Sequence, residues 1–289
     1  MLSYQHAFHA GNHADLLKHF VLSFVLNSLN KKDKPYTFFD THSGSGVYDL
    51  LDNRSLKTGE AQKGIVSLLK ENPASPDFAF YFDFVNSFYK NNLYPGSPLF
   101  ELGLMRKTDT LILSELHPKE ITVLKETMEK YKTPASPLVQ LHNRDGWEMI
   151  KALTPPKTKR LEVLIDPSYE ETKDYTDAQK TISLINKKWT NGIIMLWYPL
   201  LAHREEIIKQ MIQNITESAK EVNQNVEIEN LTLLVASKDS HKEVSLEELK
   251  EDKKNPPRLY GSGMLVINAP WKLKETTQGF IDFVQSRII

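Results

Sequence analysis

Short apolar runs that alternate with longer amphipathic stretches constrain the fold of this chain more than any other feature. Such alternation is typical of an α/β fold with a mostly parallel sheet, because a helix returns the chain between parallel strands. No obvious helix separates the last two runs, so we expect six strands in parallel order and a final antiparallel one. The seven strand candidates are residues 36–41, 110–116, 138–143, 162–166, 192–198, 229–236 and 263–269.

One interval along the chain is too long for a single crossover helix. More than 60 residues separate the first strand from the strand that begins at Thr110, whereas one crossover needs about 15. The helix nearest that strand is expected to have Ser97 as its cap and Pro98 at its first position. We therefore expect one domain over residues 1–289 that carries a small inserted helical subdomain at residues 48–93.

The composition excludes several classes of protein. The 289 residues include no cysteine, which excludes disulfides and thiolate metal sites. No apolar run approaches the ~18 residues that a membrane span needs. Histidines interrupt the N-terminal stretch where a signal peptide would be apolar, so we expect a cytoplasmic protein. The net charge of −1 does not indicate a general affinity for nucleic acid, although a basic patch can be local.

Four acidic residues stand at or just after the ends of predicted parallel strands: Asp40, Glu115, Asp145 and Asp166. The carboxyl ends of parallel strands meet at one edge of a sheet, which is where ligands bind in open α/β folds. Each acid also has a purely structural interpretation. Asp145, for example, fits a helix capping box with Glu148. The four acids taken together favour a ligand site.

The chemistry of this edge indicates which ligand it holds. The first strand runs into a turn around Gly44, which lets the backbone approach a ligand closely, but the turn is not the G-x-G-x-x-G of dinucleotide sites. An acid after the second strand suits ribose hydroxyls, and an acid after the third suits the exocyclic amine of adenine. A nucleoside that has no phosphate and carries a charged amino-acid tail is S-adenosylmethionine. We expect it at Asp40, His42, Glu115 and Asp145.

The stretch VLIDPSYE, residues 163–170, joins a buried strand to a carboxylate, a proline and an aromatic residue. An enzyme that methylates an exocyclic amine holds the NH2 group with acceptors and directs the nitrogen lone pair at the methyl sulfonium. Asp166 and the carbonyl of Pro167 supply two acceptors, and Tyr169 offers a base a stacking surface. The run resembles the (D/N/S)-P-P-(Y/F) motif of methyltransferases that act on adenine N6, cytosine N4 or a glutamine side chain. Ser168 replaces the second proline.

A closer resemblance covers residues 1–272. It rests on MLSYQHAFHAGNHADLLKHF, DTHSGSGVY, YPGSP, SELHP, DPSYE, LWYPL and GSGMLVINAPW, which together resemble the RlmJ family of bacterial 23S ribosomal RNA adenine-N6 methyltransferases. The resemblance implies a Rossmann-like class I methyltransferase fold, S-adenosylmethionine as cofactor and 23S ribosomal RNA as partner. It implies that Asp166 is catalytic, that Tyr4 meets RNA and that Lys18 reaches the substrate. The cofactor contacts that it implies are His19, His42, Ser97, Glu115, Asp145, Gly146 and Asp166.

Three functions stay open on the sequence alone. The first is RNA adenine-N6 methylation, the second is DNA adenine-N6 methylation, and the third is nucleic-acid binding without catalysis in the use of external DNA. His9 and His13 are spaced for a zinc pair, but no acid-plus-histidine set follows them, so we expect no metal. We expect a monomer without a membrane partner. Further candidates for RNA recognition are Lys57, Lys63, Lys253, Lys254 and Arg258.

Overall fold

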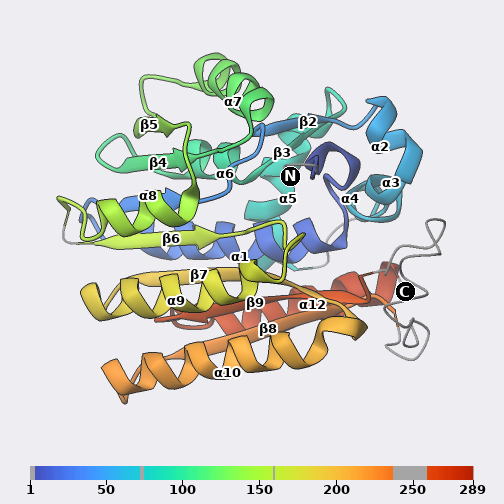
Figure 1. Cartoon of the computed structure of the whole chain (residues 1–289). Helices are drawn as coiled ribbons and strands as arrows, with labels where there is room; N and C mark the ends of the chain where they lie inside the picture. The colour runs from blue at the N-terminus through green and yellow to red at the C-terminus, as the bar shows by residue number, and fades with distance from the viewer. Residues whose placement is uncertain (1–3, 72–74, 159, 237–258, 289) are drawn as a thin grey trace.

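A seven-stranded sheet forms the centre of the protein in the computed structural model, which describes residues 4–71, 75–158, 160–236 and 259–288 (Figure 1). The strand order is β5-β4-β1-β6-β7-β9-β8, and β9 is antiparallel to both of its neighbours while the other pairs are parallel. The seven strands and the antiparallel direction of the last one are therefore confirmed. Their bounds are β1 Thr37–Asp40, β4 Thr110–Ser114, β5 Leu138–His142, β6 Leu161–Ile165, β7 Ile193–Leu200, β8 Ile228–Leu234 and β9 Gly261–Ile267.

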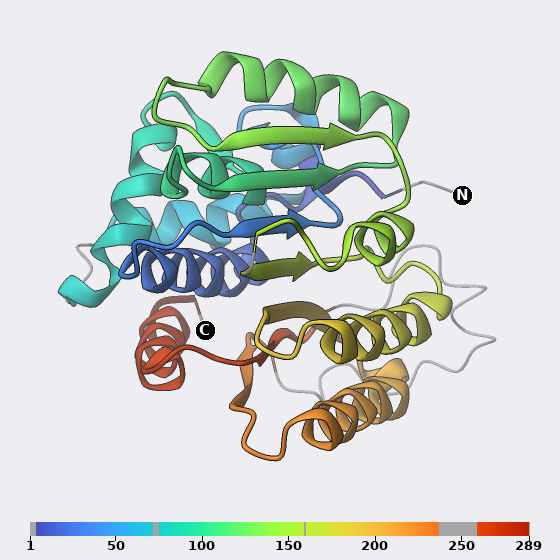
Figure 2. The ribbon, with the colours of Figure 1, turned by 90° about the vertical axis from the view of Figure 1, so that its left-hand side faces the viewer.

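Helices cover both faces of the sheet and enclose one apolar cluster on each side (Figure 2). The first face carries α1 (His13–Asn30), α6 (Ser97–Leu104), α7 (Pro118–Tyr131) and α12 (Leu273–Ile288). The second face carries α8 (Gly146–Leu153), α9 (Lys173–Lys188) and α10 (Glu205–Val222). This three-layer arrangement buries both sides of the central strands, which explains why β6, for example, is an apolar run without regular polar alternation, whereas the edge strands β5 and β8 are partly exposed.

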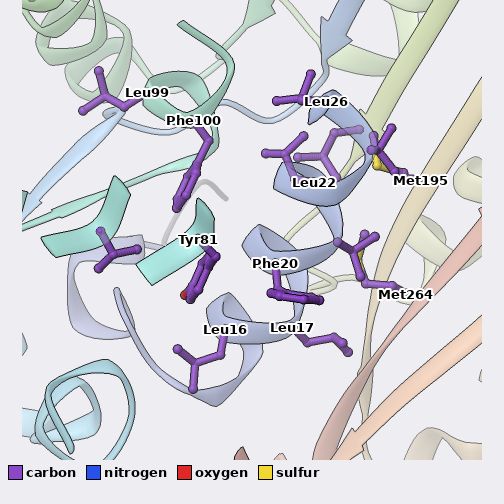
Figure 3. Close-up of a cluster of buried hydrophobic side chains, with 14 of the residues drawn as sticks. Leu16, Leu17, Phe20, Leu22, Leu26, Tyr81, Leu99, Phe100, Met195 and Met264 are labelled. Carbon is purple, nitrogen blue, oxygen red and sulfur yellow. The ribbon is translucent and has the colours of Figure 1, made fainter. Parts of the chain in front are cut away.

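Helix α1 precedes the first strand and is almost entirely buried. The side chain of Asn12 caps it by accepting from the backbone N–H groups of Ala14 and Asp15. Its side chains pack against the sheet and against α5 and α6 (Figure 3), and they also contact α12, which lies beside α1 on the same face of the sheet. Phe20, for example, stacks on Phe280 of α12 at a centroid distance of 3.9 Å. The packing fixes the polar residues of α1 in place beside the sheet.

Besides α6, the described residues of the interval between β1 and β4 form four α-helices and a two-stranded antiparallel ribbon. The helices are α2 (Asn53–Thr58), α3 (Glu60–Lys63), α4 (Ile65–Leu69) and α5 (Ala79–Tyr89), and the ribbon is β2 (Val47–Asp49) with β3 (Leu93–Pro95). The sequence did not indicate the ribbon, because strands of three residues show no periodicity. Three short 3-10 turns complete the described elements: η1 His6–Phe8, η2 Pro76–Phe78 and η3 Ala202–Arg204.

The start of α6 corrects one prediction. Gly96 stands at the N-cap and Ser97 is already the first helical residue, so Ser97 is not the cap. Its hydroxyl instead donates to Asp40 Oδ2 at 2.7 Å, which leaves it unable to cap the helix.

Within the described residues, no helix is both long enough and apolar enough to cross a bilayer.

Candidate active site at the carboxyl edge of the sheet

The topology creates a switch point beside β1. The chain adds β4 and β5 on one side of β1 and then returns to place β6 on the other side. Asp40 is the last residue of β1, Glu115 directly follows β4, and Asp166 directly follows β6. Ligands of open α/β sheets bind in the crevice outside such a point. Three of the four predicted acids thus stand at the carboxyl ends of neighbouring strands around this point, and Asp145 at the start of α8 follows β5.

Asp40 is fully buried at the carboxyl edge of the sheet. Its carboxylate accepts from the Ser97 hydroxyl at 2.7 Å and from the backbone N–H of His42 at 3.1 Å. Burial raises the pKa of Asp40 to about 7. Glu101 of α6 is also fully buried, and among the described residues neither of its oxygens has a hydrogen bond of ordinary geometry. Burial raises the pKa of Glu101 well above its usual range, and the neighbouring Asp40 raises it further.

The turn after β1 holds Glu115 in place. Gly44 has a φ of +60°, in the left-handed region that favours glycine, and a Cβ there would lie 2.4 Å from the Tyr48 hydroxyl oxygen. The backbone N–H of Gly44 donates to Glu115 Oε2 at 2.8 Å, and that of His117 donates to Oε1 at 2.6 Å. Burial raises the pKa of Glu115, while these two amides oppose the rise by stabilising the carboxylate.

Helix α8 begins directly against the end of β1. Asp145 caps the helix by accepting from the backbone N–H of Glu148 at 3.0 Å, which confirms the predicted cap. A Cβ at Gly146 would lie 2.0 Å from the carbonyl oxygen of Thr41, so only glycine allows this approach. The ring of His42 packs edge-on against Trp147 at 5.0 Å, and burial lowers the pKa of His42 to about 4. Its imidazole is therefore neutral at physiological pH.

The loop after β6 presents Asp166 to a lysine of α1. Asp166 Oδ2 accepts from Lys18 Nζ at 2.7 Å, and the same ammonium is 2.8 Å from Asp15 Oδ1. Burial alone would lower the pKa of Lys18, but the carboxylates of Asp15 and Asp166 raise it above its usual range. Lys18 also lies 5.9 Å from the ring centre of Trp197, at the carboxyl end of β7. The lysine is buried, so it is part of this site and not of an open surface.

Tyr169 does not present an open stacking surface in this structure. It has a φ of +53° and is buried, and its ring packs against Tyr175 at 4.6 Å. Its hydroxyl donates to the carbonyl oxygen of Trp197 at 2.9 Å. Pro167 is buried and Ser168 is exposed. In this structure Tyr169 therefore braces the loop against β7.

The remaining predicted site residues are either buried in α1 or exposed at the surface. His19 is buried in α1, where Nδ1 lies 2.8 Å from the Tyr94 hydroxyl and burial lowers the pKa of His19 to about 3. Tyr4 is exposed and stacks on His9 at 5.8 Å. The predicted RNA-binding residues Lys57 and Lys63 are exposed, and Lys253, Lys254 and Arg258 lie outside the described residues.

His9 and His13, which are spaced for a zinc pair, have different surroundings. His9 Nδ1 lies 3.0 Å from Glu60 Oε2, and His13 is largely enclosed, with its pKa lowered to about 4 by burial. Among the residues that the structure describes, no three histidine, aspartate or glutamate side chains are grouped so that they could hold a metal ion.

The donor set at the carboxyl edge fits S-adenosylmethionine. Carboxylic acids end β1, directly follow β4 and β6 and cap α8, which suits a ligand that carries a sulfonium, an ammonium group and sugar hydroxyls. Beside them the backbone packs closely at Gly44 and Gly146, where a side chain would clash with the Tyr48 hydroxyl and the Thr41 carbonyl respectively. The predicted cofactor residues at this edge are Asp40, His42, Gly44, Ser97, Glu115, Asp145, Gly146 and Asp166, whereas His19, also predicted, lies buried in α1 against Tyr94.

Comparisons with known proteins agree with this geometry. Residues 33–289 match the family described as "Ribosomal RNA large subunit methyltransferase D, RlmJ". The chain is 35% identical to the Ribosomal RNA large subunit methyltransferase J of Escherichia coli (strain K12), over 292 residues that cover 100% of this chain and 95% of the relative. It is 33% identical to the protein of the same name from Haemophilus influenzae, with 100% and 95% covered.

The fold agrees with a solved structure as well. A crystal structure of a Legionella pneumophila protein superposes with a TM-score of 0.76 at 26% identity, over 97% of this chain and 94% of that one. The strand order and directions are those of a Rossmann-like class I methyltransferase. With the family matched over most of its length and both curated relatives matched over its whole length, the chain belongs to the RlmJ family of ribosomal RNA large subunit methyltransferases.

Proposed function

We propose that this protein transfers the methyl group of S-adenosylmethionine to the N6 amine of one adenine in 23S ribosomal RNA. The observation that carries the proposal is the position of Asp166, whose carboxylate stands at the switch point and is held by Lys18 at 2.7 Å. A carboxylate fixed beside a cofactor crevice can orient an amine for attack. The family and the names of both relatives support ribosomal RNA as the substrate class.

Two acceptor groups in the loop after β6 bind the adenine amine. When bound, S-adenosylmethionine supplies an electrophilic methyl group. Asp166 Oδ1, the oxygen that Lys18 does not bind, accepts one N–H of the adenine amine, and the carbonyl of Pro167 accepts the other. Both acceptors direct the nitrogen lone pair toward the methyl carbon. Lys18 holds the other oxygen of Asp166 in place through their ion pair.

Glu115 and Asp145 are expected to determine cofactor affinity. We expect Glu115→Ala with Asp145→Ala to weaken S-adenosylmethionine binding at least tenfold, about 1.4 kcal/mol or more, because two hydrogen-bonding carboxylates are lost. Calorimetry on the folded protein measures this change. The control is Glu126→Ala with Glu129→Ala, two exposed acids of α7 that alter the net charge equally. Unchanged affinity in the first variant would place the cofactor elsewhere.

An unpaired or extruded base is the substrate that this site can accept. The N6 amine of an adenine within a helix is out of reach, and flipping it out costs a few kcal/mol. Loops and bulges of RNA remove most of that cost. The near-neutral chain has little general attraction for phosphates, so it depends on shape around one site. Tyr4, Lys57 and Lys63 are the candidates for this contact, with residues 48–93 as a helical subdomain facing the RNA.

Methyl transfer to three substrates tests the proposal. We expect methylation of one adenine in protein-free 23S RNA, weak activity on intact large subunits, where proteins cover the site, and little on duplex DNA. Radiolabelled methyl transfer at matched concentration and salt measures all three. Efficient methylation of duplex DNA without methylation of RNA would favour the DNA methyltransferase instead. We further propose that the protein acts in the cytoplasm as a monomer.

A further inference from the structure

A continuous chain of polar contacts links the exposed N-terminal tyrosine to the loop after β6. The Tyr4 hydroxyl lies 2.9 Å from His6 Nδ1, and His6 Nε2 lies 2.9 Å from Asp15 Oδ2. Asp15 Oδ1 lies 2.8 Å from Lys18 Nζ, which lies 2.7 Å from Asp166 Oδ2. Asp15 stands at the centre of this chain.

Asp15 is the least exposed of the five residues that these contacts link. It is fully buried, and the backbone N–H of Gly11 donates to its Oδ2 at 2.9 Å. An ionised carboxylate in this position is stable only because a cation and hydrogen-bond donors surround it. A buried charge that only held α1 together would cost more than an apolar side chain of similar volume. Its position between His6 and Lys18 points to a role in the site.

We propose that Asp15 is a positioning residue that holds Lys18 against Asp166 and His6 against Tyr4 during methyl transfer. The inference rests on the proposed function for the identity of the reacting residue, Asp166. It assigns Asp15 no contact with the substrate or the cofactor. Its effect passes through the two side chains that it binds.

The effect on Lys18 is electrostatic. Asp15, Lys18 and Asp166 together carry one net negative charge, so the amine of the substrate meets an acceptor that the lysine has not neutralised. Without the charge of Asp15, the ammonium would be paired with Asp166 alone. The carboxylate of Asp166 would then be a weaker acceptor for the amine, and Lys18 would be free to move.

The effect on His6 concerns the position of a proton. Asp15 Oδ2 accepts from His6 Nε2, so in the neutral ring Nδ1 carries no proton and accepts from the Tyr4 hydroxyl. The oxygen of Tyr4 is thereby turned so that its lone pairs face away from His6. Asp15 thus orients an exposed side chain that the family resemblance assigns to RNA contact.

The test compares Asp15→Asn with Asp109→Asn. Asp109 is also buried, pairs with a cation three positions away, Arg106, and accepts from a backbone N–H, but it lies before β4 at the opposite edge of the sheet. It therefore reproduces the cost of losing a buried, paired carboxylate. We expect Asp15→Asn to lower kcat about tenfold or more, with the Kd for S-adenosylmethionine within about twofold of wild type. We expect Asp109→Asn to leave kcat unchanged and to lower only the melting temperature.

A Lys18→Met background shows whether Asp15 acts through Lys18. We expect Asp15→Asn to lower kcat by a smaller factor in that background than in the wild type, because only the contact through His6 is then left to lose, and residues that act as one unit are not additive. Equal kcat values for Asp15→Asn and Asp109→Asn, or full additivity with Lys18→Met, would overturn the proposal. If Asp15→Asn alone does not fold, the comparison of Lys18→Met with Asp15→Asn plus Lys18→Met decides. The double variant leaves no unpaired buried charge, because both partners of the ion pair are replaced.

The substrate is chosen so that failure of this inference is distinct from failure of the proposed function. The wild-type protein is assayed first on protein-free 23S RNA and on duplex DNA. All variants are then compared on whichever nucleic acid the wild type methylates. Loss of RNA methylation by the wild type contradicts the proposed function, whereas the ratio of variant to wild-type kcat tests Asp15 on either substrate.

Discussion

Asp166→Asn is expected to lower the rate of methyl transfer by about 10²-fold or more, the scale of losing a positioned polar group in a transition state. The amide keeps the size of the side chain but replaces one acceptor oxygen with a donor, which would face the donating amine of the adenine. The variant also leaves Lys18 without one of its two anionic partners. The loss should therefore appear in the single-turnover rate on 23S RNA.

The chain offers a close control for this variant. Asp177 on α9 has the same side-chain exposure as Asp166, 16%, and also pairs with a lysine, Lys173. Asp177→Asn is expected to retain the wild-type rate. Calorimetry with S-adenosylmethionine separates loss of cofactor from loss of amine orientation. A folded Asp166→Asn enzyme that binds the cofactor and turns over near the wild-type rate would remove Asp166 from catalysis.

Asp40→Asn is expected to stabilise the cofactor-free protein at pH 8. Burial raises the pKa of Asp40 to about 7 in the folded protein, against an ordinary value of 3.8. Between these two values the folded protein keeps a proton that the unfolded chain has released. The free energy of unfolding therefore falls as pH rises through this window, by an amount on the order of a few kcal/mol. Asparagine does not ionise, so the variant loses this penalty.

Urea denaturation at pH 5 and pH 8 measures the effect. The difference in unfolding free energy between Asp40→Asn and wild type should shift in favour of the variant as pH rises. Glu101 titrates in the same direction, so Asp40→Asn with Glu101→Gln should flatten the profile further. Asp109→Asn removes an ion-paired acid and should destabilise at both pH values. An identical difference at pH 5 and pH 8 would show that Asp40 is not protonated in the fold. The same variant should bind S-adenosylmethionine less well, which separates stability from function.

Features that depend on local periodicity were predictable from the sequence. The apolar runs identified all seven strands of the sheet, and the lack of an obvious helix between the last two runs predicted the final antiparallel strand. The ribbon of β2 and β3 was not predictable, because three residues show no alternation and Pro95 argues against a strand. Ser97 was predicted as the cap of α6, but the cap is Gly96 and Ser97 is the first helical residue. The sequence could not show this, because the Ser97 hydroxyl donates to Asp40, 57 positions away in the chain.

The site was predictable only where its residues follow strands. Asp40, Glu115 and Asp166 stand at strand ends, so their convergence follows from the parallel order. Asp15 was missed because its pair with Lys18 looks like an ordinary i,i+3 ion pair of a helix, and Glu101 was missed because its neighbour Asp40 lies far away in the sequence. Tyr169 was expected to face a base, but no local pattern could show that its hydroxyl bonds to the carbonyl of Trp197.

The ion pair between Lys18 and Asp166 has a consequence for how the molecule folds during synthesis. The two residues are 148 positions apart in the sequence, so α1 leaves the ribosome long before its partner loop. Contacts of such separation form late, because the loop that joins them must first be closed. A growing chain that stops short of β6 therefore has the lysine and Asp15 but not the aspartate that completes the site. Methyltransferase activity should return during refolding only with the last step of tertiary assembly, and no N-terminal fragment that ends before β6 should show any.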